Sequence, residues 1–230
     1  MARFTDICSM RILLIAATRA ELAPTLHWLK DHEYQAGGHL IIAGTTGIGC
    51  LMSGWWLGRH LAEIHPQLVV QAGIGGSIDP VWNSRQPVVV EKDCLADLGA
   101  WEAGKFKTIF DLQLSYENQP PFYEGWLLNP HHRLLEATQL PKATAATVNE
   151  ISTEQRDIDR MQGAGIHIES MEGAALHFAC LQCGIPFLQI RTVSNQVGVR
   201  DKSKWEIANA IESLNSYLQH WLPTIKSEWL

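Results

Sequence analysis

The sequence predicts an α/β fold of three layers, α/β/α, built around a central mixed, mostly parallel twisted sheet. Apolar runs of strand length, such as residues 10–17 and 68–72, alternate with longer segments whose apolar residues recur at helical spacing. Polar or glycine-rich residues follow several of these runs. In open α/β sheets ligands bind beyond the carboxyl ends of the strands, so we expect the functional site at that edge.

The first strand, residues 10–17, reads MRILLIAA, and such a continuous apolar run is typical of a strand buried on both faces. Thr18 is predicted to cap the helix that follows, over residues 19–29. The further strands are expected at residues 39–43, 68–72, 87–91 and 144–148, and the further helices at residues 50–64 and 153–162. Three segments have no regular pattern: a glycine loop at 73–77, turn chemistry at 97–106, and an unassigned stretch at 112–142.

Residues 166–200 form the stretch around which the rest is organised. A short apolar strand from residue 166 breaks into a helix at residues 170–173, and a turn leads to a second strand that ends at residues 193–195. The last helix is predicted over residues 205–222, where apolar residues recur at helical spacing.

Composition and charge narrow the class of protein. The 230 residues carry a formal net charge of −6 with interspersed signs and no basic stripe, which argues against a nucleic-acid partner. No apolar run is long enough to cross a membrane, and five cysteines, an odd number, favour reduced thiols. We therefore expect one cytoplasmic domain over residues 1–230, with an N-terminal extension at 1–9 and a core at 10–222.

Three polar residues are placed at the predicted strand ends, namely Glu21, Glu172 and Asn195. Each also has an ordinary structural interpretation. Glu21 and Glu172 fall at helix starts, where a carboxylate complements the helix dipole, and Ser170 would be the N-cap before Glu172. Asn195 is a common type of residue in a turn after a strand. Position alone leaves the structural and the catalytic interpretations open.

Five motifs in order resemble one enzyme family. MRILLIAATRAEL, TTGIG, QAGIGGSI, ESMEGAAL and IRTVSN follow one another as in the methylthioadenosine/adenosylhomocysteine nucleosidase branch of the purine nucleoside phosphorylase superfamily. The resemblance covers nearly the whole chain. Within the branch, DLG-x-x-E-x-G-x-F at residues 97–106 and SN-x-V-x-x-RD-x-S-x-W at residues 194–205 are most similar to the futalosine hydrolases.

The resemblance implies a nucleoside phosphorylase-like fold and hydrolysis of an N-glycosidic bond. Glu21 would accept a proton from the attacking water, and Glu172, with Met171 beneath the ribose, would hold the sugar hydroxyls. Asn195 would address the leaving base. Methylthioadenosine nucleosidases have an aspartate at this position, and an amide, which both donates and accepts, favours a 6-oxopurine such as hypoxanthine.

The resemblance also implies a wider set of substrate-binding residues: Thr18, Ile48, Ile74, Gly75, Val148, Asn149, Met171, Ser194, Arg200 and Trp205. Arg200 would bind the carboxylate of futalosine's aromatic substituent, and Trp205 would stack on its ring or belong to the core. No cofactor and no metal are expected. A homodimer or higher homo-oligomer is implied, and one of the adjacent Trp55 and Trp56 is a candidate for its interface.

Three alternatives stay open at this stage. A methylthioadenosine/adenosylhomocysteine-type nucleosidase would differ mainly in the base it accepts. A purine nucleoside phosphorylase would need cations for phosphate, and residues 72–78 contain no Arg or Lys. A binding module that has lost the reaction would be expected to lack Glu21 or Glu172, and both are present.

Overall fold

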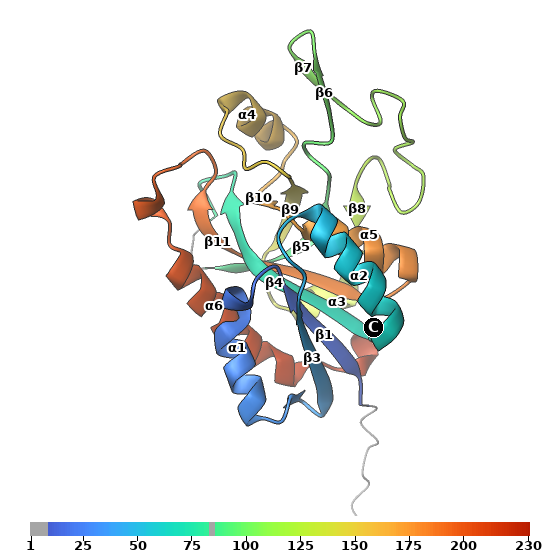
Figure 1. The fold of residues 1–230 in the computed structure, drawn as a ribbon, viewed down its shortest axis with the longest axis vertical. Helices are drawn as coiled ribbons and strands as arrows, with labels where there is room; N and C mark the ends of the chain where they lie inside the picture. Colours follow the sequence, from blue (N-terminus) through green and yellow to red (C-terminus); the bar gives the residue numbers. More distant parts are fainter. Residues whose placement is uncertain (1–8, 83–85) are drawn as a thin grey trace, which may run out of the picture.

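The computed structural model describes residues 9–82 and 86–230, so the predicted extension at residues 1–9 lies outside the described part except for Ser9. Helices cover both faces of a central sheet, which confirms the three-layer α/β/α prediction (Figure 1). Helices α1 and α6 pack together on one face, and α2 packs with α5 on the other. The helices are α1 (Arg19–Asp31), α2 (Cys50–Ile64), α3 (His132–Ala137), α4 (Gln155–Gly163), α5 (Gly173–Cys183) and α6 (Ile207–Trp221).

The main sheet has the order β10-β9-β5-β11-β4-β1-β3-β2, with β8 added at β5. Most neighbours along this path are parallel, as predicted, including β1 with β3 and β4, and β4 with β11. The strands are β1 (Arg11–Ala16), β2 (Gln35–Ala36), β3 (His39–Thr45), β4 (Leu68–Ser77), β5 (Pro87–Asp93), β8 (Leu127–Leu128), β9 (Lys142–Thr147), β10 (Ile168–Ser170) and β11 (Phe187–Gln196).

One end of the sheet curls back on itself. Strand β10 pairs with β9 in parallel and also with the end of β4 in antiparallel fashion, through Ile168 opposite Ser77 and Glu169 opposite Gly76. The open sheet expected from the sequence is therefore closed at this end. Residues 169–170 end β10 and residues 171–172 follow it. The closure brings all four next to the carboxyl ends of β4 and β11.

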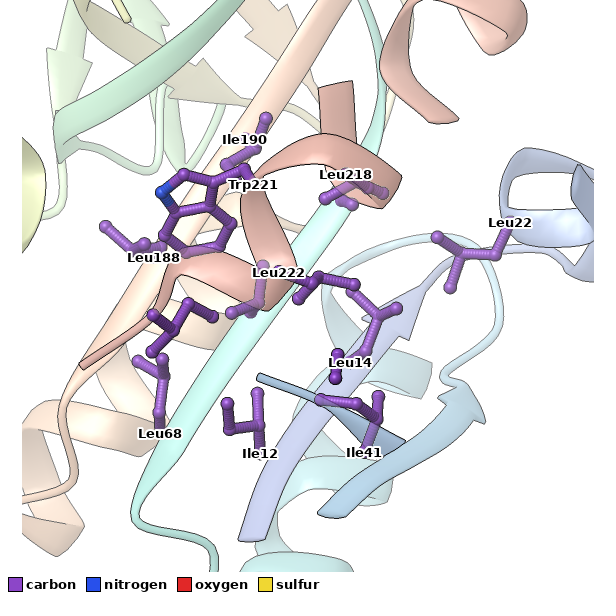
Figure 2. Close-up of a cluster of buried hydrophobic side chains, with 14 of the residues drawn as sticks. Ile12, Leu14, Leu22, Ile41, Leu68, Leu188, Ile190, Leu218, Trp221 and Leu222 are labelled. Atoms are coloured by element: carbon purple, nitrogen blue, oxygen red, sulfur yellow. The ribbon is translucent and has the colours of Figure 1, made fainter. Parts of the chain in front are cut away.

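The packing of β1 shows why these segments form buried strands. Ile12 and Leu14 point to the α1 and α6 side, whereas Leu13 and Ile15 point to the α2 and α5 side, and all four are fully buried. Figure 2 shows the first of these clusters, with Leu22, Leu218 and Trp221 packed over the strand residues. Each such aliphatic side chain contributes about 1.5–3 kcal/mol by leaving water.

The glycine segment at residues 73–77 is a correction to the sequence prediction. It is not a loop but the second half of β4, paired with β11 and β10. Glycine is required there because neighbouring groups approach closely. An ideal Cβ on Gly75 would lie 2.8 Å from the backbone oxygen of Glu169.

Residues 97–106 are a second correction. They form most of a small hairpin, β6 (Gly99–Glu102) with β7 (Lys105–Thr108), that stands beside α4 at the end of the molecule beyond β9 and β10 (Figure 1). Two cation–π contacts join hairpin and helix: Arg156 lies 4.3 Å from the Trp101 ring centroid, and Arg160 lies 4.3 Å from that of Phe106. The stretch at 112–142 supplies β8 and α3.

Short 3₁₀ turns at Lys202–Lys204, Leu222–Thr224 and Ser227–Trp229 complete the described elements. Across residues 9–82 and 86–230, no helix combines the length and the apolar character that crossing a membrane requires.

Candidate active site

A cavity of about 410 Å³ opens where β1, β4, β10 and β11 end. Its volume lies in the range, roughly 300–1,000 Å³, that small-molecule sites occupy. All three candidate catalytic residues line it. The full lining is Ala17, Thr18, Ala20, Glu21, Ile48, Ile74, Gly75, Gly76, Ile151, Glu169, Ser170, Met171, Glu172, Ser194, Asn195, Trp205, Ile207 and Ile211.

Glu21 is buried and held from two sides. Its Oε2 accepts hydrogen bonds from the backbone nitrogen and the hydroxyl of Thr18, each at 2.9 Å, and its Oε1 accepts one from the backbone nitrogen of Ile74 at 3.1 Å. Thr18 stands at the N-cap of α1, as predicted. The carboxylate thus complements the helix start, as the structural interpretation predicts, and it also spans from α1 to β4 and lines the cavity.

Glu172 is also buried, and it forms the N-cap of α5. Ser170, predicted to be that N-cap, ends β10 instead, because its pairing with Thr147 of β9 continues the strand through it. The Glu172 Oε1 accepts a hydrogen bond from the backbone nitrogen of Gly49 at 3.1 Å, and its Oε2 lies 3.4 Å from Nη1 of Arg191. A backbone donor and a guanidinium therefore fix the carboxylate.

Arg191 contacts a candidate catalytic carboxylate and was not predicted from the sequence. It is 1% exposed, its Nη2 donates to Oε1 of Gln71 at 2.8 Å, and its Nη1 reaches the Glu172 carboxylate. The signal was present, since an arginine interrupts the apolar run FLQI–TV of β11. Residues 72–78 contain no Arg or Lys, and the cation comes instead from β11, the strand paired with them.

Gly73 makes room for both charged groups. An ideal Cβ at this position would lie 2.5 Å from Nη1 of Arg191 and 2.8 Å from Oε1 of Glu21. A Cβ at this position would force the guanidinium or the carboxylate to shift, so glycine lets both groups lie over β4 as they do.

Asn195 lies at the end of β11, just after a register shift between Val193 and Asn195. Its Oδ1 accepts a hydrogen bond from the hydroxyl of Ser194 at 2.9 Å, and its Nδ2 donates to the backbone oxygen of Gln196 at 3.1 Å. The shift lets both Ser194 and Asn195 line the cavity, although alternate residues of a regular strand point to opposite faces.

Six further predicted binding residues line the cavity besides Ser194, namely Thr18, Ile48, Ile74, Gly75, Met171 and Trp205. The indole nitrogen of Trp205 donates to the backbone oxygen of Val199 at 2.8 Å, which holds the ring at the cavity wall. Ile151, Glu169, Ile207 and Ile211 line the cavity as well and were not predicted. The apolar ones carry no local sequence signal, because an isoleucine in a helix or loop is ordinarily a packing residue.

Three predicted binding residues do not line the cavity. Val148 is buried in the cluster under α4, and the backbone nitrogen of Asn149 is tied to the Asp97 carboxylate. Both belong to the segment that leads from β9 to Ile151. Of that segment, Ile151, two to three residues further along the chain, is the residue that lines the cavity. Arg200 stands outside, with its guanidinium 5.3 Å from the centroid of the Trp205 ring.

Two buried polar residues, Asp93 and Thr147, lie next to the start of α5, the helix that Glu172 caps. The hydroxyl of Thr147 donates to Oδ1 of Asp93 at 2.9 Å and accepts from the backbone nitrogen of Ala174, in the first turn of α5, at 2.7 Å. Burial raises the pKa of Asp93 from 3.8 to about 6, against the opposing hydrogen bond from Thr147. Burial also lowers the pKa of His177 from 6.5 to about 4, so this histidine is neutral at pH 7.

Within the described part of the chain, no three His, Cys, Asp or Glu side chains gather closely enough to hold a metal ion. The side chains that line the cavity carry carboxylate, amide and hydroxyl groups and form an apolar wall, and the Arg191 guanidinium lies beside Glu172.

The phosphorylase superfamily is the class of protein to which this chain belongs. Its family model aligns with residues 11–220, a range that contains Glu21, Glu172, Arg191 and Asn195. Among solved structures, the S-adenosylhomocysteine nucleosidase of Streptococcus pyogenes, in complex with 5-methylthiotubericidin, has a TM-score of 0.77 at 18% identity, over 96% of this chain and 99% of that one. The methylthioadenosine/S-adenosylhomocysteine nucleosidase of Colwellia psychrerythraea, in complex with adenine, has the same TM-score at 20% identity, over 96% and 97%.

Curated relatives narrow the class. The futalosine hydrolase of Streptomyces coelicolor is 32% identical over 165 residues, which are 70% of this chain and 67% of the relative. That of Thermus thermophilus is 30% identical over 210 residues, which are 88% of this chain and 91% of the relative. The chain therefore belongs to the futalosine hydrolase family of the phosphorylase superfamily.

Proposed function

We propose that this protein hydrolyses the N-glycosidic bond of futalosine, releasing hypoxanthine and dehypoxanthine futalosine, in menaquinone biosynthesis by the futalosine pathway. Identity to futalosine hydrolases over most of the chain supports the substrate. The observation that carries the chemistry is the placement of two buried carboxylates, Glu21 and Glu172, with the amide of Asn195 in one cavity.

Glu21 acts on the nucleophile. The oxygen of a water molecule forms a bond to the anomeric carbon, and one of the water's protons passes to the Glu21 carboxylate. The three hydrogen bonds that Glu21 accepts, from Thr18 and Ile74, hold its carboxylate in place for this transfer. A negatively charged group in this position also disfavours phosphate as the nucleophile.

Glu172 acts on the sugar. As the bond between the anomeric carbon and the base nitrogen breaks, its electrons leave with the base and positive charge develops on the ribose. The Glu172 carboxylate stabilises this charge and binds the sugar hydroxyls, with Met171 beside it on the cavity wall. Arg191 keeps the buried carboxylate paired and oriented, at 3.4 Å.

Asn195 receives the base. Its amide group can donate to O6 or N7 of a 6-oxopurine, whereas an ionised aspartate could only accept. An amide does not supply an acidic proton, so the proton for the leaving base comes from another source, such as water. The resulting preference is for hypoxanthine over adenine.

Two related activities are the alternatives. A methylthioadenosine/adenosylhomocysteine nucleosidase would bind a 6-aminopurine, which the amide of Asn195 fits less well. A purine nucleoside phosphorylase would need cationic donors free to bind phosphate. Arg191 forms an ion pair with Glu172, and its guanidinium is already engaged by Glu172 and Gln71.

Side-by-side incubation with futalosine, inosine and methylthioadenosine, followed by chromatography of the products, tests the assignment. We expect hypoxanthine from futalosine at a rate well above that of base release from the other two. Faster release of adenine from methylthioadenosine would favour the first alternative. Binding of futalosine without release of any base would favour a module that has lost the reaction.

We also propose that the protein works as a homodimer through α2. This helix and the turn before it expose a row of large apolar residues: Ile48 50%, Leu51 84%, Met52 50% and Trp55 65%. Contiguous exposed apolar surface marks an interaction site. Because Ile48 also lines the cavity, a partner seated on this row would complete the cavity wall.

Sedimentation of the wild type and of Leu51→Arg tests this proposal. We expect a dimer that the substitution converts to monomer, with weaker binding of futalosine. A wild type that sediments as a monomer would contradict it.

We further propose a cytoplasmic location, in keeping with the odd number of cysteines. Fractionation of cells that express the protein would check it.

A further inference from the structure

Glu169 is a third carboxylate of the cavity, and neither the proposed reaction nor the dimer uses it. It lines the cavity together with Glu21 and Glu172, and only 5% of it is exposed. Its Oε1 accepts a hydrogen bond from the backbone nitrogen of Ser152 at 3.2 Å. Its Oε2 is buried and has no hydrogen-bond partner among the residues that the structure describes.

An unpartnered acceptor of this kind is costly. Burying a carboxylate oxygen without a donor costs free energy, and nearly all buried polar groups in native proteins are paired. Burial raises the pKa of Glu169, and hydrogen bonding from the side chain and the backbone of Ser152 acts against this. Of the charged groups that affect it, Asp97 raises the pKa and Arg200 lowers it. Because Glu169 lines the cavity, a ligand bound there can supply a donor to this carboxylate.

The register of the sheet places Glu169 on the base side of the site. Gly76 of β4 is paired with Glu169 of β10 on one side and with Asn195 of β11 on the other. Residues paired in this way point to the same face, and strands are spaced about 4.8 Å apart, so the two backbones stand about 10 Å from each other. Glu169, Gly76 and Asn195 all line the cavity, so a base bound there can meet both side chains.

The two side chains have complementary hydrogen-bonding character. The amide of Asn195 offers donors, and the free oxygen of Glu169 accepts only. A 6-oxopurine presents a carbonyl at C6 next to an N–H at N1, an acceptor beside a donor. A 6-aminopurine presents the reverse, an amino group next to a bare ring nitrogen, which would face the carboxylate with no hydrogen between them.

We propose that Glu169 is a specificity-determining residue, which accepts the N1–H of the 6-oxopurine while Asn195 binds its carbonyl. This assignment rests on the proposed function, because it concerns the base of the same substrate. It differs from a structural role, in which Glu169 only holds Ser152 and so the Ile151 segment. Asp97 supplies the comparison, since it binds the backbone nitrogens of Asn149 and Glu150 in that segment but does not line the cavity.

Calorimetric binding of hypoxanthine and of adenine to the wild type, Glu169→Gln and Asp97→Asn tests the proposal. We expect the wild type to prefer hypoxanthine and Glu169→Gln to lower this preference by about tenfold or more, since the amide can donate to the bare N1 of adenine. Asp97→Asn should weaken both bases equally. An unchanged ratio in Glu169→Gln, an equal change in Asp97→Asn, or a wild type that binds neither base would overturn the proposal.

Two additions keep the outcome interpretable. If Glu169→Gln does not fold, Glu169→Asp replaces it, since the shorter side chain keeps the charge and withdraws it from the base. The preference for hypoxanthine over adenine should fall in this variant as well. Hydrolysis of futalosine by the wild type is assayed in parallel. If the wild type hydrolyses futalosine but does not prefer hypoxanthine, the role of Glu169 is contradicted and the proposed function is not. If the wild type prefers hypoxanthine but does not hydrolyse futalosine, the proposed function is contradicted and the role of Glu169 is not.

Discussion

Arg191 and Glu172 form an ion pair inside the protein, with Nη1 and Oε2 3.4 Å apart and the two side chains 1% and 7% exposed. The arginine comes from the middle of β11 and the glutamate from the N-cap of α5. Two charges are kept out of water beside the cavity, at a desolvation cost that their mutual attraction offsets. The pair therefore fixes the position of a carboxylate that we assign to the sugar.

Replacement of Arg191 by methionine would leave the Glu172 charge buried and unpaired. We expect the free energy of unfolding to fall by about 3–5 kcal/mol, as measured by urea denaturation. The double variant Arg191→Met with Glu172→Gln should recover part of this loss, because no unpaired charge remains. A loss below about 1 kcal/mol in the single variant would mean that the pair is unimportant to the fold.

Glu21→Gln and Glu172→Gln should each lower kcat for futalosine by about 10²-fold or more. Glutamine keeps the shape of the side chain and most of its hydrogen bonds, so far-UV circular dichroism should be unchanged. The rate of hypoxanthine release measures the effect. Near wild-type turnover in either variant would remove that residue from the mechanism.

Asn195→Asp should move selectivity from futalosine toward its 6-amino analogue, aminodeoxyfutalosine. The substitution is nearly isosteric, and it replaces a donor by an acceptor against the base. Such mismatches cost on the order of 1–3 kcal/mol, which corresponds to about a ten- to hundredfold change in the ratio of the two kcat/KM values. If the ratio is the same in both enzymes, Asn195 does not read the base.

Arg200→Ala should raise KM for futalosine and leave KM for inosine unchanged. Its guanidinium lies over the ring of Trp205, which lines the cavity, so Arg200 stands where a carboxylate on a long 5′ substituent could reach it. Lys202→Ala in the adjacent turn is the control, and neither KM should change in it. An equal rise for both substrates in Arg200→Ala would show that the residue acts on the loop and not on the carboxylate.

Asp93→Asn should make the protein more stable above pH 6. The folded-state pKa of Asp93, about 6, lies above its ordinary 3.8, so folding favours the protonated form. The wild type therefore loses up to about 3 kcal/mol from this group as the pH rises from about 4 to 6, and the variant does not. Unfolding curves at pH 5 and 7.5 measure it. A variant less stable than the wild type at pH 7.5 would contradict the sign.

Sequence patterns were sufficient for the layers and for most of the site. Apolar runs predicted the strands, and the ordered motifs placed Glu21, Glu172 and Asn195 at one edge, where the structure brings them into one cavity. The closure of β10 onto β4 was not predictable, because strand pairing between distant segments leaves no local pattern. For the same reason, the roles of Glu169 and Arg191 can be inferred only from the residues that surround them in the structure.

The glycines of β4 show the same limit. A run of glycines usually marks a loop, since glycine weakens a strand. Here Gly73 stays in the strand because Arg191 and Glu21 occupy the space that a side chain would fill. The glycine at this position therefore reflects the side chains that lie over β4, namely Arg191 of β11 and Glu21 of α1, and does not mark a loop.

The most direct test of the proposed function is the product pattern from futalosine in buffer with and without phosphate. Mass spectrometry should detect hypoxanthine and dehypoxanthine futalosine at the same rate in both buffers. Hypoxanthine that appears only with phosphate, together with a sugar 1-phosphate, would contradict hydrolysis and assign the site to a phosphorylase.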